Sequence, residues 1–268
     1  MGKVICVANQ KGGVGKTTTV INLAASLAVA HKKTLFIDFD PQGNATSGVG
    51  VDKEEIRNTI YNAVIGESQI NDISIDIEPE SLGGFLTIVP ANSELTGAEV
   101  ELIHLERREW RLKEAIDSVR DQYDYIFIDC PPSLSLLTVN ALAASDSVLV
   151  PVQCEYYAME GLGQLKRTIS LIKQRLNPEL SIEGYLLTMF DSRNNICHMV
   201  ANELRNYFNE EVFDTVISRN VKLAESPSHG KPALLYDLKS IGAKSYISLA
   251  QEMIARNGGP SVEEVQPG

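Results

Sequence analysis

A glycine-rich loop near the beginning of the sequence constrains the fold and the chemistry of this chain more than any other feature. The segment from Gln10 to Thr18 reads Q-K-G-G-V-G-K-T-T and directly follows a short apolar run at 4–9. Glycines let the backbone come close to a ligand, and the N–H groups at the start of a helix attract phosphate oxygens. The loop therefore predicts a phosphate-binding site between a strand and a helix.

The side chains of this loop have distinct expected roles. We expect Lys16 to contact the β- and γ-phosphates of a nucleotide and the hydroxyl of Thr17 to bind Mg²⁺. The ordinary P-loop pattern requires glycine where this chain has Gln10, so the ordinary motif is not matched. A second lysine, Lys11, follows it. The loop residues expected to bind the nucleotide are Lys11, Gly12, Gly13, Val14, Gly15, Lys16, Thr17 and Thr18.

Carboxylates that follow two apolar runs are candidates for binding the metal and the attacking water. Asp38 and Asp40 are two residues apart, so on an extended strand both face the same way. Asp129 closes another apolar run and has the placement of a residue that holds Mg²⁺. Ligands of open α/β sheets bind beyond the carboxyl ends of the strands, so we expect these carboxylates near the loop. The expected metal ligands are Thr17, Asp38 and Asp129.

Alternation of short β-branched runs with longer helical stretches predicts the fold class. Some runs, such as 126–128 and 148–150, are apolar without alternation, which is typical of strands buried on both faces. We predict an α/β fold with a doubly wound, mostly parallel β-sheet flanked by helices. The expected strands are 4–9, 34–40, 85–89, 125–129, 147–152, 182–190 and 212–217. The expected helices include 16–31, 98–121, 135–144, 161–176, 195–208 and 243–256.

The chain is predicted to form a single P-loop ATPase domain over residues 1–256, followed by a disordered tail at 257–268. Neither an internal repeat nor a linker divides the sequence, and residues 52–84 are its least regular part. The tail combines glycine, proline and acidic residues without apolar periodicity. We therefore expect the tail to contribute nothing to the core.

Composition excludes several classes of protein. The sequence contains no run of 18 apolar residues and no signal peptide, so we expect a cytoplasmic protein without a membrane span. Its four cysteines form no C-x-x-C pair, so we expect buried apolar thiols and neither a zinc site nor a disulfide framework. The net charge of −11 argues against a protein that coats nucleic acid uniformly. Residues 160–268 nevertheless hold 12 Lys and Arg against 13 Asp and Glu, which leaves room for a local basic patch.

Five segments together match the pattern of one family of ATPases. They read K-G-G-V-G-K-T at 11–17, D-F-D-P-Q-G-N-A-T-S-G at 38–48, D-C-P-P-S-L at 129–134, P-V-Q-C-E-Y-Y-A-M-E-G at 151–161 and R-N-V-K-L-A-E-S-P-S at 219–228. This chain resembles the ParA/MinD group of deviant Walker A ATPases, and most closely the short Soj-type chromosome-partitioning ParA proteins. The likeness covers roughly residues 1–256 and is weakest over 52–84.

The resemblance implies an ATPase that uses ATP and Mg²⁺, is slow alone and is stimulated by a partner protein. In the family, the residue at Lys11 reaches across a homodimer interface to the nucleotide of the other subunit, where it offsets charge between two facing nucleotides. Asp40 would orient or activate the attacking water, so the expected catalytic residues are Lys11, Lys16 and Asp40. Asn220 belongs to a segment that lines the adenine pocket, and Ser218 departs from the family, which usually has proline there.

The same resemblance implies non-specific binding of double-stranded DNA by the ATP-bound dimer. The family positions correspond to Arg193 and Lys222, and Arg219, Lys231 and Lys239 are neighbours. A dimer doubles the number of phosphate contacts, which gives a physical reason for control by ATP. The expected partner is a ParB-type centromere-binding protein, and the expected function is chromosome or plasmid partitioning by a nucleoid-associated switch.

Two other functions stay open. One is an ATPase of the same fold that positions another cargo, such as a chemoreceptor array or a secretion machine. The other is a metabolic P-loop synthetase that activates an amide or a carboxylate, although Lys11 and the lack of an obvious second-substrate motif weigh against it. A MinD-like membrane protein would end in a basic amphipathic helix, whereas this sequence ends in Gly-Gly-Pro and acidic residues, so membrane binding is not expected.

Overall fold

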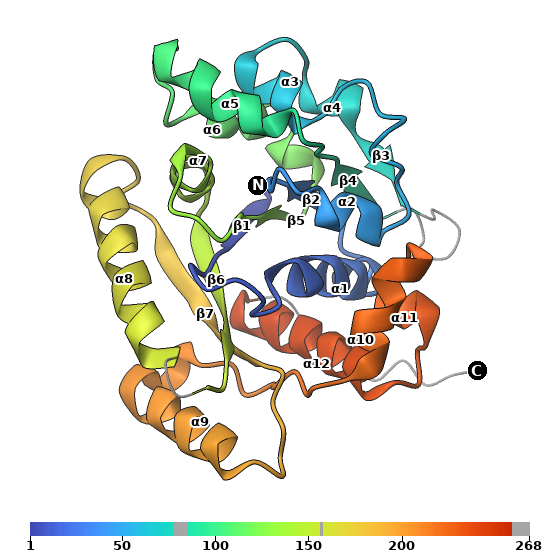
Figure 1. Ribbon diagram of the computed structural model, residues 1–268, viewed down its shortest axis with the longest axis vertical. Coiled ribbons are helices and arrows are strands. Elements are labelled where there is room, and N and C mark those ends of the chain that lie inside the picture. The colour runs from blue at the N-terminus through green and yellow to red at the C-terminus, as the bar shows by residue number, and fades with distance from the viewer. Residues whose placement is uncertain (78–84, 156–157, 259–268) are drawn as a thin grey trace.

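A seven-stranded β-sheet covered by helices on both faces forms the centre of the molecule (Figure 1). The computed structural model describes residues 1–77, 85–155 and 158–258. The strands are β1 Lys3–Val7, β2 Thr34–Asp38, β3 Ile75–Asp76, β4 Leu86–Val89, β5 Tyr125–Asp129, β6 Ser147–Gln153 and β7 Ser181–Thr188. The helices are α1 Lys16–Val29, α2 Asn44–Gly48, α3 Ile60–Ile65, α4 Ile70–Ile73, α5 Leu95–Glu101, α6 Arg111–Asp117, α7 Leu136–Ala144, α8 Ala158–Arg175, α9 Asn195–Phe208, α10 Val221–Glu225, α11 Ala233–Tyr236 and α12 Ile241–Arg256.

The order of the strands confirms the predicted doubly wound fold. Along the sheet the order is β3-β4-β2-β5-β1-β6-β7, so the chain winds outward from β1 in both directions. Six strands run parallel, and only the two-residue edge strand β3 pairs antiparallel, with β4. Every residue of β2 and β5 is buried, as expected for parallel strands covered on both faces.

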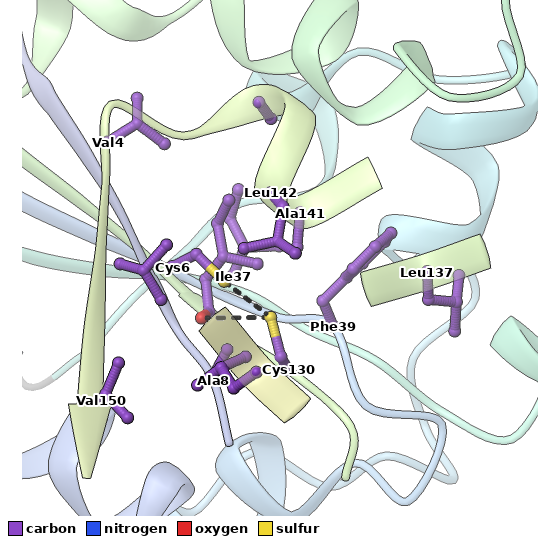
Figure 2. Close-up of a cluster of buried hydrophobic side chains, with 14 of the residues drawn as sticks. Val4, Cys6, Ala8, Ile37, Phe39, Cys130, Leu137, Ala141, Leu142 and Val150 are labelled. Carbon is purple, nitrogen blue, oxygen red and sulfur yellow. Dashed lines mark hydrogen bonds between the residues drawn. The ribbon is translucent and has the colours of Figure 1, made fainter. Parts of the chain in front are cut away.

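Buried apolar side chains form one cluster on each face of the sheet. Alternate residues of β1 divide between them, because successive side chains of a strand point to opposite faces. Val4 and Cys6 join the cluster beneath α7, which Figure 2 shows in close-up, and Ile5 and Val7 join the cluster beneath α1 and α12. All four cysteines are free and buried, as predicted. The Sγ atoms of Cys6 and Cys130 lie 3.1 Å apart (Figure 2).

The segment 212–217, predicted as a strand, does not extend the sheet. It runs beside β7, where the backbone N–H groups of Phe213 and Ile217 donate to the carbonyls of Tyr185 and Leu187 at 3.0 and 2.8 Å. The only bridges between the described residues here are isolated ones, between Tyr185 and Val212 and between Phe190 and Ser218. The backbone N–H groups of Asp214 and Thr215 donate instead to the carboxylate of Glu252 on α12, at 2.8 and 2.9 Å. The carboxylate of Glu252 thus accepts hydrogen bonds from two backbone N–H groups that could otherwise pair with a neighbouring strand.

The predicted helix 98–121 is interrupted in the structure. α5 ends at Glu101, α6 begins at Arg111, and Arg107 between them has φ +55°, which no helix accommodates. The indole of Trp110 donates to the carbonyl of Leu176 at 3.3 Å, so tertiary contacts shape this connection. Tertiary packing therefore overrides the helical propensity of the segment.

Two other predictions concern the irregular segment and the tail. Residues 52–84 contain two short helices, α3 and α4, and the edge strand β3, while 78–84 lie outside the described residues. The last helix, α12, ends at Arg256, where the predicted domain ends. Most of the predicted disordered tail, 259–268, lies outside the described residues.

Candidate nucleotide-binding site

The glycine-rich loop joins β1 to α1 and leaves the start of that helix open to a ligand. Gly13 and Gly15 adopt left-handed conformations, with φ +74° and +89°, which residues other than glycine rarely accept. Gly15 caps the 14-residue helix α1 without a side-chain hydrogen bond, so no side chain caps the first N–H groups of that helix. An anion placed there gains both these donors and the helix dipole.

Hydrogen bonds to two neighbouring strands hold the loop in place. The side chain of Asn9 donates to the carbonyl of Pro151 in β6 at 2.8 Å and accepts from the backbone N–H of Lys11 at 3.0 Å. The hydroxyl of Thr188, the last residue of β7, donates to the carbonyl of Val14 at 2.8 Å. The loop is therefore fixed before any ligand arrives.

Lys16 is buried at the bottom of the loop, with 7% of its surface exposed. Its ammonium lies 3.3 Å from the carbonyl oxygen of Lys11. Burial lowers the pKa of Lys16, and the nearby Asp129, Cys130 and Asp40 partly oppose this shift. A buried cation of this kind is stabilised by a bound phosphate.

Lys11 points away from its own loop. It does not line the pocket next to the loop, and its ammonium pairs with the carboxylate of Glu155, just beyond β6. Both partners are exposed, with 41% and 48% of their side-chain surfaces accessible. An exposed ion pair contributes little free energy, so Lys11 can leave Glu155 at little cost.

Asp129 is the last residue of β5 and is completely buried. Neither of its carboxylate oxygens makes a hydrogen bond of ordinary geometry with the described residues. Burial raises the pKa of Asp129 well above its usual value and Asp38 raises it further, whereas the nearby Thr17 hydroxyl and the Lys16 ammonium lower it. A buried carboxylate without donors is suited to a cation.

These groups fit a magnesium ion bound together with a nucleotide. Mg²⁺ prefers oxygen ligands and keeps several waters, so one or two protein groups suffice when phosphates supply the rest. Asp129 and the hydroxyl of Thr17 are the groups placed for this role. Within the part of the chain that the structure describes, no cluster of three or more His, Cys, Asp or Glu side chains could hold a metal by itself.

Asp38 has a different environment from Asp129, although both are predicted metal ligands. One of its carboxylate oxygens accepts two hydrogen bonds from Thr46, from the backbone N–H and from the hydroxyl, each 2.7 Å long. The other accepts from the backbone N–H of Asp40 at 3.3 Å. Burial raises the pKa of Asp38 to about 6, and the bonds from Thr46 oppose the shift. Asp38 thus holds the following segment in position.

Asp40 begins a tight turn over residues 40–43, which we call the Asp40 loop. The backbone N–H of Gly43 donates to the carbonyl of Asp40, and that of Gln42 donates to its carboxylate, both at 2.9 Å. Asp40 is 9% exposed and lines the pocket next to the glycine-rich loop. Its carboxylate can therefore reach a water molecule beside a bound phosphate.

Two adjoining cavities meet at the start of α1. The polar cavity has a volume of 370 Å³ and is lined by Gly12, Gly13, Gly15, Lys16, Thr17, Thr18, Asp40, Gln42, Asn44, Pro132 and Met189. The apolar cavity has a volume of 290 Å³ and is lined by Gly15, Thr18, Thr188, Met189, Ile217, Ser218, Arg219, Asn220, Leu223, Ala224 and Tyr246. Because they share Gly15, Thr18 and Met189, the pair matches a ligand with phosphates at one end and a flat base at the other.

Asn220 lies in the apolar cavity, and its side-chain oxygen accepts from the backbone N–H of Lys222 at 3.0 Å, which caps α10. Its amide N–H groups form no hydrogen bond with a described residue in that cavity and can donate to a ligand. Sequence reasoning missed Met189 and Tyr246. Met189 follows the carboxyl end of β7, so the rule that ligands bind at strand ends could have found it. Tyr246, whose hydroxyl lies 3.1 Å from that of Thr19, gives no signal in the sequence.

Each of the two predicted DNA-binding cations has a carboxylate beside it. Arg193 is 88% exposed and forms two hydrogen bonds with Asp191, at 3.0 and 2.9 Å. These bonds lower the pKa of Asp191 to about 2, and Arg219 contributes. Lys222 pairs with Glu225 at 2.9 Å, and this contact raises the pKa of Lys222. Neither cation is free of compensating charge.

None of the helices in the described ranges is long and apolar enough to cross a membrane.

Sequence comparison decides the family. A family model described as an AAA domain matches residues 2–182. The chain is 56% identical over 257 residues to the chromosome partitioning protein ParA of Myxococcus xanthus, covering 96% of this chain and 89% of that one. It is 53% identical over 258 residues to the sporulation initiation inhibitor protein Soj of Bacillus subtilis, covering 96% and 100%. The chain belongs to the ParA/Soj family of P-loop ATPases.

Solved structures agree with membership of the ParA/Soj family. Cobyrinic acid a,c-diamide synthase from Mycobacterium smegmatis, with bound ADP and magnesium, has a TM-score of 0.82, is 33% identical and covers 100% of both chains. The same synthase with a bound ATP analogue and magnesium has a TM-score of 0.82 at 32% identity, covering 99% of this chain and 100% of that one. The MinD ATPase of Pyrococcus furiosus has a TM-score of 0.77 at 25% identity, covering 96% and 100%. The predicted fold and ATPase class are confirmed, and the expected cofactors, ATP and Mg²⁺, agree with the ligands of the synthase.

Proposed function

We propose that this chain is an ATP-dependent dimerising switch that partitions chromosomes or plasmids. In the ATP state, a homodimer binds double-stranded DNA without sequence preference, and a ParB-type centromere-binding partner stimulates hydrolysis and release. The observation that carries the proposal is the position of Lys11. Its ammonium lies outside its own pocket and, among the residues that the structure describes, is held only by the exposed Glu155, so it is available to a second nucleotide.

Within one subunit, the nucleotide occupies the two adjoining cavities. The backbone N–H groups of Gly12 to Thr18 and the buried ammonium of Lys16 bind the phosphates, while Asn220 and its neighbours bind the base. Asp129 and Thr17 hold Mg²⁺, which offsets the charge of the phosphates when bound. Asp38, the third predicted metal ligand, also supports this arrangement through Thr46.

Asp40 acts on the water that attacks the γ-phosphate. Its carboxylate accepts one hydrogen bond from Gln42 and faces the polar cavity, so its remaining lone pairs can accept from a water molecule and orient it. Phosphoryl transfer depends mainly on positioning and on charge stabilisation, so one carboxylate and the loop donors suffice. Lys11 from the other subunit adds a cation that is present only in the dimer.

Dimerisation couples this chemistry to DNA. One subunit offers Arg193 and Lys222, each partly neutralised by a neighbouring carboxylate, and this number of cations is too small for firm binding to phosphates. Two subunits double the number of cations on one rigid body, and affinity for DNA rises steeply with the number of neutralised phosphates. Loss of the ATP-dependent contacts between the two subunits therefore releases DNA.

A metabolic synthetase is a second candidate, because the solved synthase from Mycobacterium smegmatis is 33% identical over the whole chain. The ParA relative is closer in sequence, at 56% identity, and favours partitioning. An ATPase that positions another cargo would share every feature of the site. A ParB-like reading frame next to this gene, with centromere-like DNA repeats, would favour partitioning over other cargo.

Retention of DNA by the purified chain tests the switch directly. We expect binding with ATP and Mg²⁺ at low salt, and little binding with ADP or without nucleotide. Lys11→Ala and Gly12→Val should abolish binding, and Asp40→Ala should prolong it. A Cβ at Gly12 meets nothing within 4 Å among the described residues, so loss of binding in Gly12→Val would point to a clash with the bound nucleotide or with a facing subunit. The exposed Lys33, at the opposite end of β2 from Asp40, supplies Lys33→Ala as the control. Equal binding with and without ATP would exclude the switch.

A further inference from the structure

The Asp40 loop is held from two sides. On the inner side, the Thr46 hydroxyl donates to buried Asp38 and accepts from the backbone N–H of Ala91 at 2.9 Å, which fixes the start of α2. On the outer side, the ammonium of Lys53 donates to the carbonyl oxygen of Gln42 at 2.8 Å. Among the described residues, Lys53 is thus the side chain that ties the loop from the solvent side.

The stem of Lys53 also packs against the loop. Gly43 has φ +61°, and a Cβ added there would lie 2.8 Å from the carbonyl oxygen of Ala91 and 3.1 Å from Cδ of Lys53. The Asp40 loop is therefore enclosed between the backbone after β4 and the lysine side chain. Movement of the loop toward solvent requires Lys53 to move first.

Among the described residues, the ammonium of Lys53 contacts the Asp40 loop and forms no ion pair with a carboxylate. Lys53 lines a pocket of 450 Å³ together with Glu54 and Glu94, yet neither forms an ion pair with it in the described part of the chain. Its ammonium donates to a main-chain carbonyl instead, and a hydrogen bond with a charged donor is stronger than a neutral one. The hydrogen bond from Lys53 to the Gln42 carbonyl indicates that Lys53 holds the loop in place.

We infer that Lys53 is a positioning residue for ATP hydrolysis, acting through Gln42 on Asp40. Gln42 links the two, because its carbonyl accepts from Lys53 while its N–H donates to the Asp40 carboxylate. The carbonyl and the N–H belong to the two peptide groups on either side of the Gln42 Cα, so holding the carbonyl restrains the backbone of Gln42 and, through it, the direction in which Asp40 faces the phosphate pocket. The inference rests on the proposed role of Asp40 and adds a residue outside the nucleotide cavity.

This role makes a distinctive kinetic prediction. Lys53 lines neither nucleotide cavity, so its loss should leave nucleotide binding intact. Misplacing a reacting group lowers the rate of the chemical step, so Lys53→Met, which keeps the stem and removes the charge, should lower kcat about tenfold. Lys53→Arg keeps a charged donor and should restore kcat to within about threefold of the parent.

The test is steady-state ATP hydrolysis by the full chain at one fixed protein concentration, together with the affinity for a fluorescent ATP analogue. Variants to compare are Lys53→Met, Lys53→Arg, Asp40→Asn and the control Lys33→Met, each checked by thermal melting. The expected result is a lower kcat for Lys53→Met with KM and nucleotide affinity unchanged, rescue by Lys53→Arg and no effect of Lys33→Met. If Lys53→Met does not fold, the shorter polar Lys53→Gln replaces it.

Four outcomes would overturn the inference. Parental kcat in Lys53→Met excludes a positioning role, and so does a loss of nucleotide affinity that accounts for the lower rate. A failure of Lys53→Arg to restore any activity would show that the stem geometry, and no charged donor, matters. Parental kcat in Asp40→Asn would instead remove the proposed role of Asp40, and with it the inference, so the two failures are distinguishable.

Discussion

Asp38 and Asp129 are paired residues in the register of the adjacent parallel strands β2 and β5, and both carboxyl groups are fully buried. Burial raises the pKa of each, and Asp38 adds to the shift of Asp129. Two neighbouring carboxylates without a cation cannot both ionise readily. Without a bound cation, this pair of carboxyl groups therefore favours a retained proton, which a magnesium ion would replace.

Asp129→Asn should stabilise the nucleotide-free chain and abolish magnesium-dependent hydrolysis. The amide does not ionise, so it removes the cost of either ionising this buried carboxyl or keeping a proton on it, and we expect the free energy of unfolding to rise by about 1–3 kcal/mol near neutral pH. Urea unfolding and ATP hydrolysis measure the two effects. A destabilised variant would show that the Asp129 carboxyl group makes stabilising hydrogen bonds that its contacts do not indicate.

Stability should fall with rising pH because of Asp38. Its folded pKa, about 6, lies above the ordinary 3.8, so the folded state keeps a proton that the unfolded chain releases. This contribution is fully present below pH 3.8 and is lost as pH rises through about 6. Asp38→Asn should gain about 1–3 kcal/mol relative to the parent across this range, measured by urea unfolding without nucleotide.

Carboxylates with lowered pKa values act in the opposite direction. At pH values above the ordinary carboxyl pKa, Asp191, Glu225 and Glu252 stabilise the folded chain. This contribution is lost as the pH falls through their lowered pKa values. They are common to the parent and to Asp38→Asn, so the difference between the two proteins reports Asp38 together with its effect on the pKa of Asp129. A difference that does not change with pH would contradict the raised pKa.

Glu155→Gln should strengthen ATP-dependent dimerisation. If Lys11 leaves Glu155 to reach the nucleotide of the other subunit, breaking this exposed pair in advance removes a cost of about 0.2–1 kcal/mol, or up to about fivefold in affinity. Sedimentation of the Asp40→Ala chain with ATP, with and without Glu155→Gln, measures the change. The exposed Glu179 supplies the control Glu179→Gln. Weaker dimers would indicate that Glu155 assists Lys11 in the dimer.

Asp191→Asn should increase the affinity for DNA in the ATP state. Asp191 neutralises Arg193 through two hydrogen bonds, and its pKa of about 2 keeps it ionised at neutral pH. Removing this charge frees Arg193 for a phosphate, and we expect about two- to tenfold tighter binding at low salt, less at high salt. Fluorescence anisotropy with a labelled duplex at two salt concentrations checks this. Unchanged affinity would remove Arg193 from the DNA-binding surface.

Local pattern was sufficient to predict the central strands and the phosphate loop. Strands β2 and β5 are buried throughout and have apolar centres, and the left-handed conformations of Gly13 and Gly15 are ones that favour glycine. Pattern failed where a distant side chain decides the structure. Glu252 takes the N–H groups of 214–215, and this contact spans more than 35 residues of sequence.

The environment of each site residue was less predictable than its identity. Asp38 and Asp129 look alike in the sequence, yet only Asp38 accepts hydrogen bonds of ordinary geometry from the described residues. The difference arises because Thr46, eight residues later, returns to Asp38 through α2. The pairing of Lys11 with Glu155 depends likewise on the sheet bringing β6 beside β1.

The four buried cysteines occur in two places that open under different conditions. Cys6 and Cys130 lie between the sheet and α7 (Figure 2), whereas Cys197 on α9 contacts the carbonyl of Cys154 after β6. A thiol reagent reacts only when a thiol reaches solvent, so labelling of the first pair times the unfolding of the central sheet. Labelling of the second pair times the detachment of α9. The two cysteine pairs thus report on two different opening motions. Comparing the rate of thiol labelling of each pair with and without ATP would show how far nucleotide binding rigidifies each region.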